Sequence, residues 1–407
     1  MAPNETDDTT TAGEVEEPRA GRRRAARYIV PVTVMGVAAA TIGLVPALAD
    51  SGDPDLPDIT AAQLIEKIAQ SDVERLSGTV KITTDLGLPD LGGLESGLLS
   101  GAAGGEGGSS ADPSGRLTEL ASGTHTLRVA ADGPDRQKLS LLENAAEYSL
   151  IHNGKDVWGY DSASNEVYHA TVDEADTKER SAQRPPATPK DFAEEALKAV
   201  DDTTSVKVDG TAQVAGRDAY RLVVEPKQSG STVGAISIAV DHETGMPLKF
   251  TLTPAGGGSA VVDVGFTKVS FDRPDASTFR FTPPKGAKVT EDTEQDRAHG
   301  GFGGKPERGP KPEEDLAKGL DGLRMLGEGW NTVATFDTGT GAGLPTEEAG
   351  GDLGGFLGSL GDQVKGDFGK GTVFSTRLVN ALITEDGTVY VGTVTKDALV
   401  KAAEAGK

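Results

Sequence analysis

The sequence predicts an α+β fold: an antiparallel β-sheet with one apolar face, covered by a few helices and followed by a small α+β module. Three observations favour this class. Long stretches alternate apolar and polar residues with a period of two, and two segments repeat apolar residues at helical spacing. A stretch rich in Gly, Pro and charge separates these elements from a second, shorter set of strands. Parallel strands would be apolar throughout, so the alternation indicates an antiparallel sheet with one wet face.

The N-terminus predicts a membrane segment. Residues 28–49 are uncharged and mostly apolar, and a bilayer-spanning helix needs about 20 such residues. Arginines stand just before them: Arg19, Arg22, Arg23, Arg24 and Arg27. We therefore expect the charged tail, residues 1–27, in the cytoplasm and the bulk of the chain outside, as a single-pass protein of the cell membrane. Cleavage after Ala49, which would release a secreted protein, is the alternative; the long tail and long apolar span favour a retained anchor.

The first helix of the folded part is predicted just after a spacer rich in Pro and Asp. Thr60 is a suitable N-cap, and Ala61, Leu64, Ile65 and Ile68 recur at helical spacing. Such a helix has one apolar face, and we expect that face to pack on the sheet.

The strands are predicted from their alternation. The apolar residues that alternate are Val80 and Ile82; Leu127 and Val129; Leu139 and Leu141; Tyr220, Leu222 and Val224; Ile236, Ile238 and Val240; Leu248, Phe250 and Leu252; Val262, Val264 and Phe266. Turn-forming pairs separate several of these runs, at Asn153-Gly154, Ala215-Gly216 and Thr244-Gly245. We expect the apolar residues to share one face of an antiparallel sheet.

A second helix is predicted between the two groups of strands. Thr188 is a suitable N-cap, Pro189 suits the first helical position, and Asp191 is placed to complete a capping box. Phe192 and Leu197 lie on its apolar face.

Changes in composition predict the domain boundaries. The main domain spans residues 59–290 and contains a Gly/Ser-rich insertion at 90–114, which is either an ordinary disordered insertion or, because it carries several leucines, a segment that touches lipid. A linker at 291–315 precedes the C-terminal module, 316–407. That module ends in a hairpin, which turns at Asp386-Gly387, and a short helix.

Charge and residue types exclude several functions. The net charge of −23 argues against nucleic-acid binding, which needs clustered Lys and Arg. The chain has no cysteine, so thiolate metal sites and cysteine nucleophiles are excluded. Its five histidines are scattered, "HETG" lacks the second His of H-E-x-x-H, and no G-x-S-x-G elbow is present. We expect a binding protein, with no catalytic residues, metal site or cofactor.

Three motifs resemble the LolA-type lipoprotein carrier family. "HNGKDVWGYDSASNEVYH", from His152, is similar to that family's "DG-x-x-x-W-x-Y" strand pair, with Asn153 where Asp is usual. "VDHETGMPL", from Val240, resembles its "D-x-x-T-x-x-P" hairpin, and "FRFTPPKGAKV", from Phe279, resembles its closing "F-x-F-x-x-P-x-G-x-x-V". The resemblance implies a strongly curved antiparallel sheet, a half-barrel, whose helices plug the mouth of an apolar cavity for acyl chains. The C-terminal module, with "GWNTVATF", bears a fainter resemblance to the RseB/MucB relatives, which bind lipoprotein signals and restrain an anti-sigma factor.

The half-barrel would surround an acyl chain with the apolar face of the sheet. The candidate cavity residues are Val80, Ile82, Leu127, Val129, Leu139, Leu141, Trp158, Tyr160, Tyr220, Leu222, Val224, Ile236, Ile238, Leu248, Phe250, Leu252, Val262 and Val264. The alternation alone leaves open whether this face encloses a cavity or a filled core. Trp158 is accordingly either a core anchor or an aromatic cavity wall, and Tyr160 shares its parity.

These observations lead to a functional hypothesis. The protein would be a membrane-tethered extracytoplasmic module that binds a lipid or lipoprotein acyl chain and handles it locally, because a tether at 28–49 prevents long-range shuttling. The alternative is an RseB/MucB-like envelope sensor that regulates an anti-sigma factor through a membrane protein partner. A structural surface domain with a filled core is a third possibility.

Overall fold

A computed structural model of the 407-residue protein describes residues 53–87, 109–113, 116, 119–171, 187–291, 323–337 and 361–406. From Pro54 onward they belong to one compact unit. The expected tail and membrane segment, most of the 90–114 insertion and nearly all of the linker lie outside the described residues. Among the helices in the described ranges, none has both the length and the apolar character that crossing a membrane requires.

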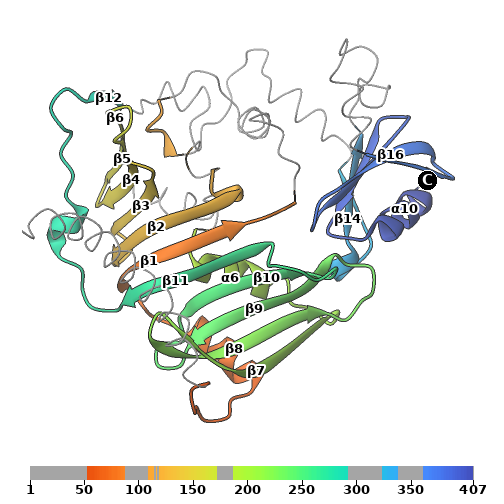
Figure 1. The fold of residues 1–407 in the computed structure, drawn as a ribbon, viewed down its shortest axis with the longest axis horizontal. Coiled ribbons are helices and arrows are strands. Elements are labelled where there is room, and N and C mark those ends of the chain that lie inside the picture. The colour runs from red at the N-terminus through yellow and green to blue at the C-terminus, as the bar shows by residue number, and fades with distance from the viewer. Residues whose placement is uncertain are drawn as a thin grey trace, which may run out of the picture. The chain divides into compact units, whose positions relative to one another are not determined.

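A mostly antiparallel sheet of twelve strands forms the main part of the described chain (Figure 1). Its first group of strands is β1 (Arg75–Thr84), β2 (Gly123–Asp132), β3 (Arg136–Glu143), β4 (Ala146–Asn153), β5 (Asp156–Asp161) and β6 (Glu166–Thr171). Its second group is β7 (Thr204–Val214), β8 (Arg217–Pro226), β9 (Val233–Asp241), β10 (Pro247–Pro254) and β11 (Val262–Ser270). The short strand β12 (Lys288–Glu291) is added beside β6, in the one parallel pairing among the described strands.

The spatial order of the strands is β12-β6-β5-β4-β3-β2-β1-β11-β10-β9-β8-β7. Each group is a meander of hairpins, and the pairing of β1 with β11 joins the two groups although they are far apart in the sequence. Within the described strands β12 and β7 are edges that do not pair with each other, so the sheet is open rather than a closed barrel.

Irregular pairings bend the sheet. The β1–β11 register shifts between Thr79 and Val80, and the β7–β8 register shifts between Val208 and Thr211. Gly210, at the second shift, has a φ of +79°, a conformation that other residues adopt rarely. Such bulges bend a strand and increase its twist. In Figure 1 the strands from β2 to β6 turn away from the plane of β7 to β11.

Two amphipathic helices pack on one face of this sheet, as the apolar spacing predicts. Helix α2 (Ala61–Ala69) begins with a capping box of Thr60 and Gln63, and α6 (Pro189–Lys198) begins with one of Thr188 and Asp191. Helix α6 lies against β9, β10 and β11, whereas α2 contacts β7 and β8. Single 3-10 turns, η1 (Glu119–Ala121) and η2 (Ala276–Phe279), precede β2 and follow β11.

The C-terminal module is a six-stranded sheet with one helix. Its elements are β13 (Arg324–Leu326), η3 (Gly329–Asn331), β14 (Val333–Asp337), β15 (Asp362–Gly366), β16 (Gly369–Ser375), β17 (Asn380–Thr384), β18 (Thr388–Gly392) and α10 (Lys396–Ala405). Gly387, with a φ of +87°, forms the expected hairpin turn between β17 and β18. Leu382 and Leu399 are fully buried between the sheet and α10. The indole Nε1 of Trp330 donates a hydrogen bond to Thr204 of β7 at 2.8 Å, which fastens the module to the main sheet.

Candidate functional site

All but two of the predicted cavity residues lie on one face of the twelve-stranded sheet, which we name the inner face. Register places them there by direct cross-strand pairing, for example Val80 beside Leu127, and Phe250 beside both Val264 and Ile238. The inner-face residues of the predicted set are Val80, Ile82, Leu127, Val129, Leu139, Leu141, Tyr220, Leu222, Val224, Ile236, Ile238, Leu248, Phe250, Leu252, Val262 and Val264. Most are buried; Leu139, Leu252 and Val262 are half-buried.

Helices cover one half of the inner face. Leu64 and Ile68 of α2 and Ala193 of α6 form a single buried cluster with the apolar residues of β8, β9 and β10. The ring of Phe192 stacks on that of Phe250, with centroids 5.3 Å apart. This half, from β7 to β10, has the packing of an ordinary core.

The other half of the inner face extends from β1 to β5 and is covered differently. Its cluster contains Val80, Leu127 and Leu141 together with Tyr148 and Leu150 of β4, and it continues into Leu120 of η1 and Leu248 of β10, with Phe192 of α6 packed against it. The two β4 residues were not among the predicted set. Their spacing of two residues in the segment "AEYSLIHN" is the signal that could have identified them.

A short segment lies against the β4–β5 end of this half, and we name residues 109–113 with Arg116 the strap. Ala111 is fully buried, and its carbonyl accepts a hydrogen bond from the Tyr148 hydroxyl at 3.1 Å. Burial raises the pKa of the Tyr148 phenol, so the hydroxyl remains a donor. A Cβ atom on Gly159 would lie 2.3 Å from the Ala111 carbonyl oxygen, so only glycine permits this approach. The end of the expected 90–114 insertion is therefore packed, not free.

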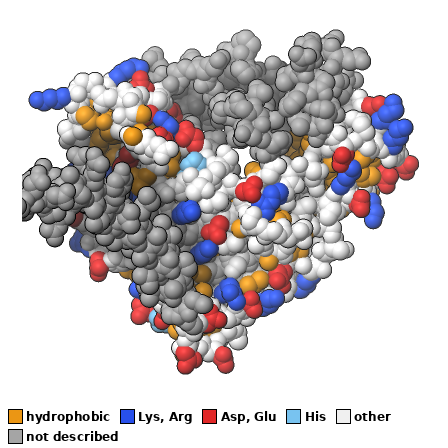
Figure 2. Space-filling model, viewed as in Figure 1, with side chains coloured by type: hydrophobic (Ala, Val, Ile, Leu, Met, Phe, Trp, Pro, Cys, Tyr) orange, Lys and Arg blue, Asp and Glu red, His pale blue; other side chains and the backbone are white. Residues whose placement is uncertain are grey.

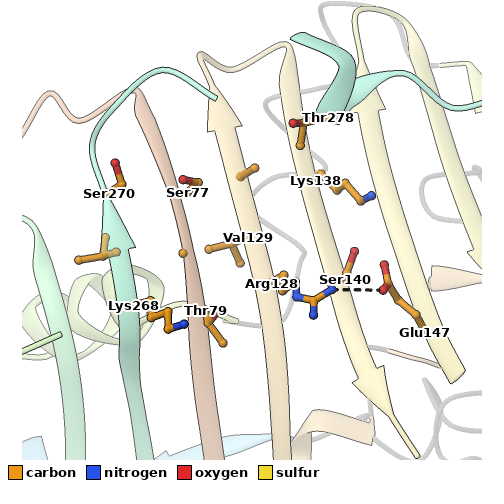
Figure 3. Close-up of a pocket in the computed structure, with 13 residues that line it drawn as sticks. Ser77, Thr79, Arg128, Val129, Lys138, Ser140, Glu147, Lys268, Ser270 and Thr278 are labelled. Carbon is orange, nitrogen blue, oxygen red and sulfur yellow. Dashed lines mark ion pairs between the residues drawn. The ribbon is translucent and has the colours of Figure 1, made fainter. Parts of the chain in front are cut away.

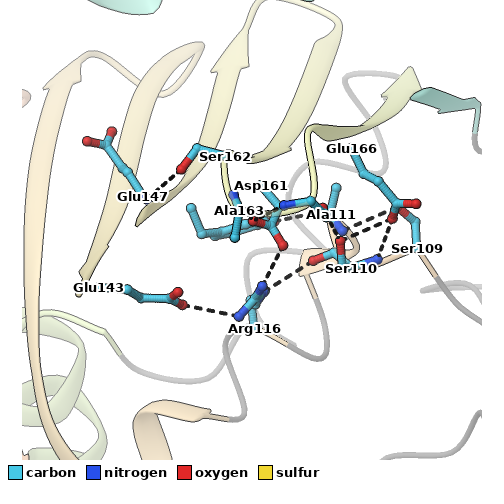
Figure 4. Close-up of polar contacts among 12 residues, drawn as sticks. Ser109, Ser110, Ala111, Arg116, Glu143, Glu147, Asp161, Ser162, Ala163 and Glu166 are labelled. Atoms are coloured by element: carbon cyan, nitrogen blue, oxygen red, sulfur yellow. Dashed lines mark hydrogen bonds and ion pairs between the residues drawn. The ribbon is translucent and has the colours of Figure 1, made fainter. Parts of the chain in front are cut away.

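Glu166 of β6 holds the first part of the strap (Figure 4). Its carboxylate accepts hydrogen bonds from the hydroxyl of Ser109 and the backbone N–H of Ser110, both at 3.0 Å. Lys288 of β12 donates to its other oxygen at 2.9 Å. The Lys288 ammonium, followed by these serine donors, lowers the pKa of Glu166 to about 2.

Arg116 holds the other end of the strap (Figure 4). Its guanidinium contacts Asp161 at 2.5 Å and both Glu143 and Glu119 at 3.1 Å. Burial alone would raise the pKa of Asp161, but the hydrogen bond and charge of Arg116 outweigh burial and lower it. The strap is thus fastened over apolar side chains mainly by polar contacts.

Trp158 and Tyr160 lie on the opposite, outer face of the sheet, so the expectation that they line the same wall as Leu222 and Phe250 is wrong. Trp158 pairs with Ile151, while the inner-face residue Leu150 pairs with Gly159. The Trp158 ring stacks on His169 at a centroid distance of 3.7 Å and meets Phe281 at 5.6 Å. Alternation shows that two residues share a face but not which face, because register is set by pairing with the next strand.

The described ranges contain no group of three or more His, Asp or Glu side chains arranged to hold a metal ion. The buried polar residues there are instead engaged in structural contacts. Asp241, for example, accepts hydrogen bonds from the backbone and hydroxyl of Thr244 and from Arg217.

Comparison with known proteins finds similarity only among solved structures: no protein-family model and no curated protein matches the chain. The MucA/MucB complex of Pseudomonas aeruginosa matches at 15% identity, over 84% of this chain and 96% of the matched chain, with a TM-score of 0.36. A LolA superfamily protein from Nitrosomonas europaea matches at 11% identity, over 55% and 99% of the two chains, with a TM-score of 0.21. A putative outer membrane lipoprotein-sorting protein domain from Vibrio parahaemolyticus matches at 10% identity, over 54% and 96%, also with a TM-score of 0.21. Matches thus occur in both groups that the sequence resembles, but scores this low assign neither a ligand nor a partner to this chain.

Proposed function

We propose that the protein binds an acyl chain of a lipid or lipoprotein against the inner face between β1 and β5, beneath the strap. The observation that carries this proposal is the contrast between the two halves of that face. One half is sealed by apolar helix packing, whereas the other is covered at one end by a strap with polar fastenings.

A segment that is held mainly by hydrogen bonds and ion pairs can open at a low cost in free energy. Water replaces a broken hydrogen bond at Ser109, Ser110 or Arg116, so each such bond contributes only about 1 kcal/mol net, somewhat more where it is charged. Apolar helix packing has no such replacement, and lifting α2 would expose Leu64 and Ile68 to water. When the strap opens, it exposes apolar side chains to water. An entering acyl chain would cover these side chains again, which offsets the cost of opening.

The proposal places the protein outside the cell membrane, tethered by residues 28–49, and assigns it binding without catalysis. An acyl chain of a lipid in the same membrane would then be within reach. A tethered protein can transfer such a lipid only to acceptors close to that membrane. The alternative is an envelope sensor, in which the occupied inner face alters the C-terminal module and, through it, a membrane protein partner such as an anti-sigma factor. The hydrogen bond from Trp330 to Thr204 supports this alternative, because it connects the C-terminal module directly to the main sheet.

An environment-sensitive fatty-acid probe tests the proposal. Leu139→Trp places a large side chain on the inner face between β2 and β4, in the half that the strap covers at one end, and we expect it to abolish probe binding while the melting temperature stays near that of the unmodified protein. Leu252→Trp is the matched control, because it makes the same change at a half-buried inner-face residue of the helix-covered half. In a filled core, overpacking at Leu139 would instead cost about 1 to 3 kcal/mol of stability.

The strap has its own variant in the same assay. In Gly159→Ala the new Cβ would collide with the Ala111 carbonyl, so the strap should lift and the probe should associate several-fold faster. Gly256→Ala is the control, because a Cβ there meets nothing within 4 Å. If the unmodified protein does not bind the probe, or if Leu139→Trp binds it equally well, the acyl-chain proposal fails. If the unmodified protein binds the probe and Leu139→Trp does not, mass spectrometry of an organic extract of natively purified protein would identify the natural ligand.

A further inference from the structure

A pocket of about 450 Å³ opens on the outer face, on the side of the sheet opposite the proposed acyl-chain site (Figure 3). Strands β11, β1, β2 and β3 form its floor, and Thr278 of η2 lies at its border. Its lining residues are Ser77, Gly78, Thr79, Arg128, Val129, Ala130, Lys138, Ser140, Glu147, Lys268, Val269, Ser270 and Thr278. We name it the outer pocket.

Register arranges the side chains of the outer pocket in two rows across the strands. In one row Thr79 of β1 stands between Lys268 of β11 and Arg128 of β2. In the next row Ser77 stands between Ser270 and Ala130, and Ala130 pairs with Lys138 of β3. Neighbouring strands are about 4.8 Å apart, so the backbones of β11 and β2 are about 10 Å apart, and only the small hydroxyl side chain of Thr79 stands between Lys268 and Arg128.

The outer pocket is positively charged within a strongly acidic protein. Three of its lining residues are cations and only Glu147 is an anion, whereas the whole chain has a net charge of −23. Arg128 forms an ion pair with Glu147 at 3.7 Å. Within the described part of the chain, Lys138 and Lys268 form no ion pair, although Lys138 is half-buried.

Glu147 responds to this positive charge. Partial burial by itself would raise the pKa of Glu147, but hydrogen bonds from Ser140 and Ser149 and the charges of Lys138 and Arg128 lower it instead. The Ser149 hydroxyl donates to the Glu147 carboxylate at 2.8 Å, and Ser140 lies 2.8 Å from Ser149. The single carboxylate is thus held at the pocket edge by its own donors, while the two lysines have no ion-pair partner among the described residues.

Hydroxyl groups complete the site. In the described chain the side chains of Ser77, Thr79 and Thr278 make no hydrogen bond to another group, whereas Ser270 donates to Asp272 at 2.9 Å. Free hydroxyls beside unpaired cations suit a tetrahedral oxyanion, because its several oxygens accept hydrogen bonds from different directions at once.

We infer that the outer pocket binds a phosphate group of a small ligand, held between Lys268, Arg128 and Lys138 over the hydroxyls of β1. The site is independent of the acyl-chain proposal, because it lies on the other face of the sheet. Its volume admits a group larger than inorganic phosphate, such as a phosphate monoester of a small polyol. The phosphate group is the shared chemistry of a free monoester and of a lipid headgroup, and the test below distinguishes these sources.

Titration calorimetry of the full-length protein with inorganic phosphate and with glycerol phosphate tests the inference. The double variant Lys138→Gln/Lys268→Gln should weaken binding at least about tenfold, since each lost charge-assisted hydrogen bond is worth about that factor. Lys249→Gln is the matched control, because Lys249 lies on the same outer face outside the pocket and pairs with Asp263 at 3.0 Å. Melting curves check that each variant is folded, and the single variant Lys268→Gln, at an exposed position, provides a milder version.

Vesicle flotation supplies the second arm, with phosphatidylcholine vesicles that contain or lack phosphatidic acid. Binding of soluble glycerol phosphate that depends on Lys138 and Lys268 supports a free monoester as the ligand. Recruitment to phosphatidic acid alone, lost in the double variant but not in Lys249→Gln, supports a headgroup. Absence of binding to all of these probes, or equal loss in the double variant and the Lys249 control, overturns the inference.

Discussion

At the scale of single residues, one tightly held carboxylate of the main sheet is Asp241, at the end of β9. It is fully buried and accepts hydrogen bonds from the backbone N–H and hydroxyl of Thr244, both at 2.8 Å. Arg217 of β8 adds a two-point ion pair. Burial would raise the pKa of Asp241, but these donors outweigh burial and lower it. The "DHETG" turn that the sequence predicts is therefore stabilised by a charge as well as by the φ of +73° at Gly245.

Asp241→Asn should lower the free energy of unfolding by about 2 to 3 kcal/mol at neutral pH, because Arg217 loses its buried partner. A lowered pKa in the folded state stabilises the protein above the ordinary Asp pKa of about 3.9, and this stabilisation is lost as the pH falls below that value. The acid side of the stability curve should therefore be flatter in Asp241→Asn. Urea unfolding from pH 7 to pH 3 measures this, with Asp263→Asn, which removes a half-buried partner of Lys249, as control. An unchanged acid slope would contradict the assignment.

At the scale of elements, β12 connects the strap to the end of the main domain. It pairs with β6 in parallel, and Lys288 bonds the same Glu166 carboxylate that holds the strap. Its last residue, Glu291, lies 2.6 Å from Nδ1 of His169, while Asp156 lies 3.0 Å from Nε2. The His169 ring in turn stacks on Trp158. The residues just before the linker are thus attached to the sheet by side chains more than by a long ladder of backbone bonds.

Glu291→Gln should loosen β12, because four residues of edge pairing provide little stability and the variant loses the carboxylate that contacts His169. Hydrogen exchange of Lys288–Glu291 should become several-fold faster, and the fluorescence of Trp158 should change as its stacked His169 moves. The overall melting temperature should shift little. Glu225→Gln, at another exposed ion pair of the same sheet, is the control. Equal exchange rates in both variants would show that β12 does not depend on Glu291.

At the scale of the whole molecule, two meanders form one open sheet because β1 pairs with β11, and the helix-covered half and the strap-covered half of the inner face follow from that junction. The strap and β12 lie on the β1–β6 side, and the outer pocket extends from β3 across the junction to β11. Binding is therefore expected to concentrate in the first meander and at its junction with β11, while the β7–β10 side serves as the rigid support.

The proposed tether gives a prediction for the complete chain. Arginines before an uncharged span hold that end inside the cell, so protease added to intact, wall-stripped cells should remove the folded modules and spare residues 1–27. Immunoblots against the tail and against the C-terminal module measure the two parts, and detergent-permeabilised cells are the control in which both are digested. Protection of residues 279–407 in intact cells would reverse the proposed orientation.

Local sequence was enough to predict the two helices that cover the main sheet and many of its strands. The capping boxes at Thr60 and Thr188, the alternating strands and the turn at Gly154 depend on residues close together in the chain, and the structure confirms them. The sharing of one face by residues such as Leu222 and Phe250 also follows from alternation, since side chains repeat every two residues in any strand.

What the tertiary structure alone decided was everything that depends on pairing between distant segments. The β1–β11 junction joins residues nearly two hundred positions apart, and no local pattern specifies it. The register of β5 with β4 turned Trp158 outward, because a shift of one residue reverses every side chain of a strand. The buried approach of Ala111 to Gly159 and the grouping of cations from β11, β2 and β3 likewise arise only when the sheet assembles. By itself the sequence determined which residues are apolar, charged or turn-forming; the fold determined which of them meet.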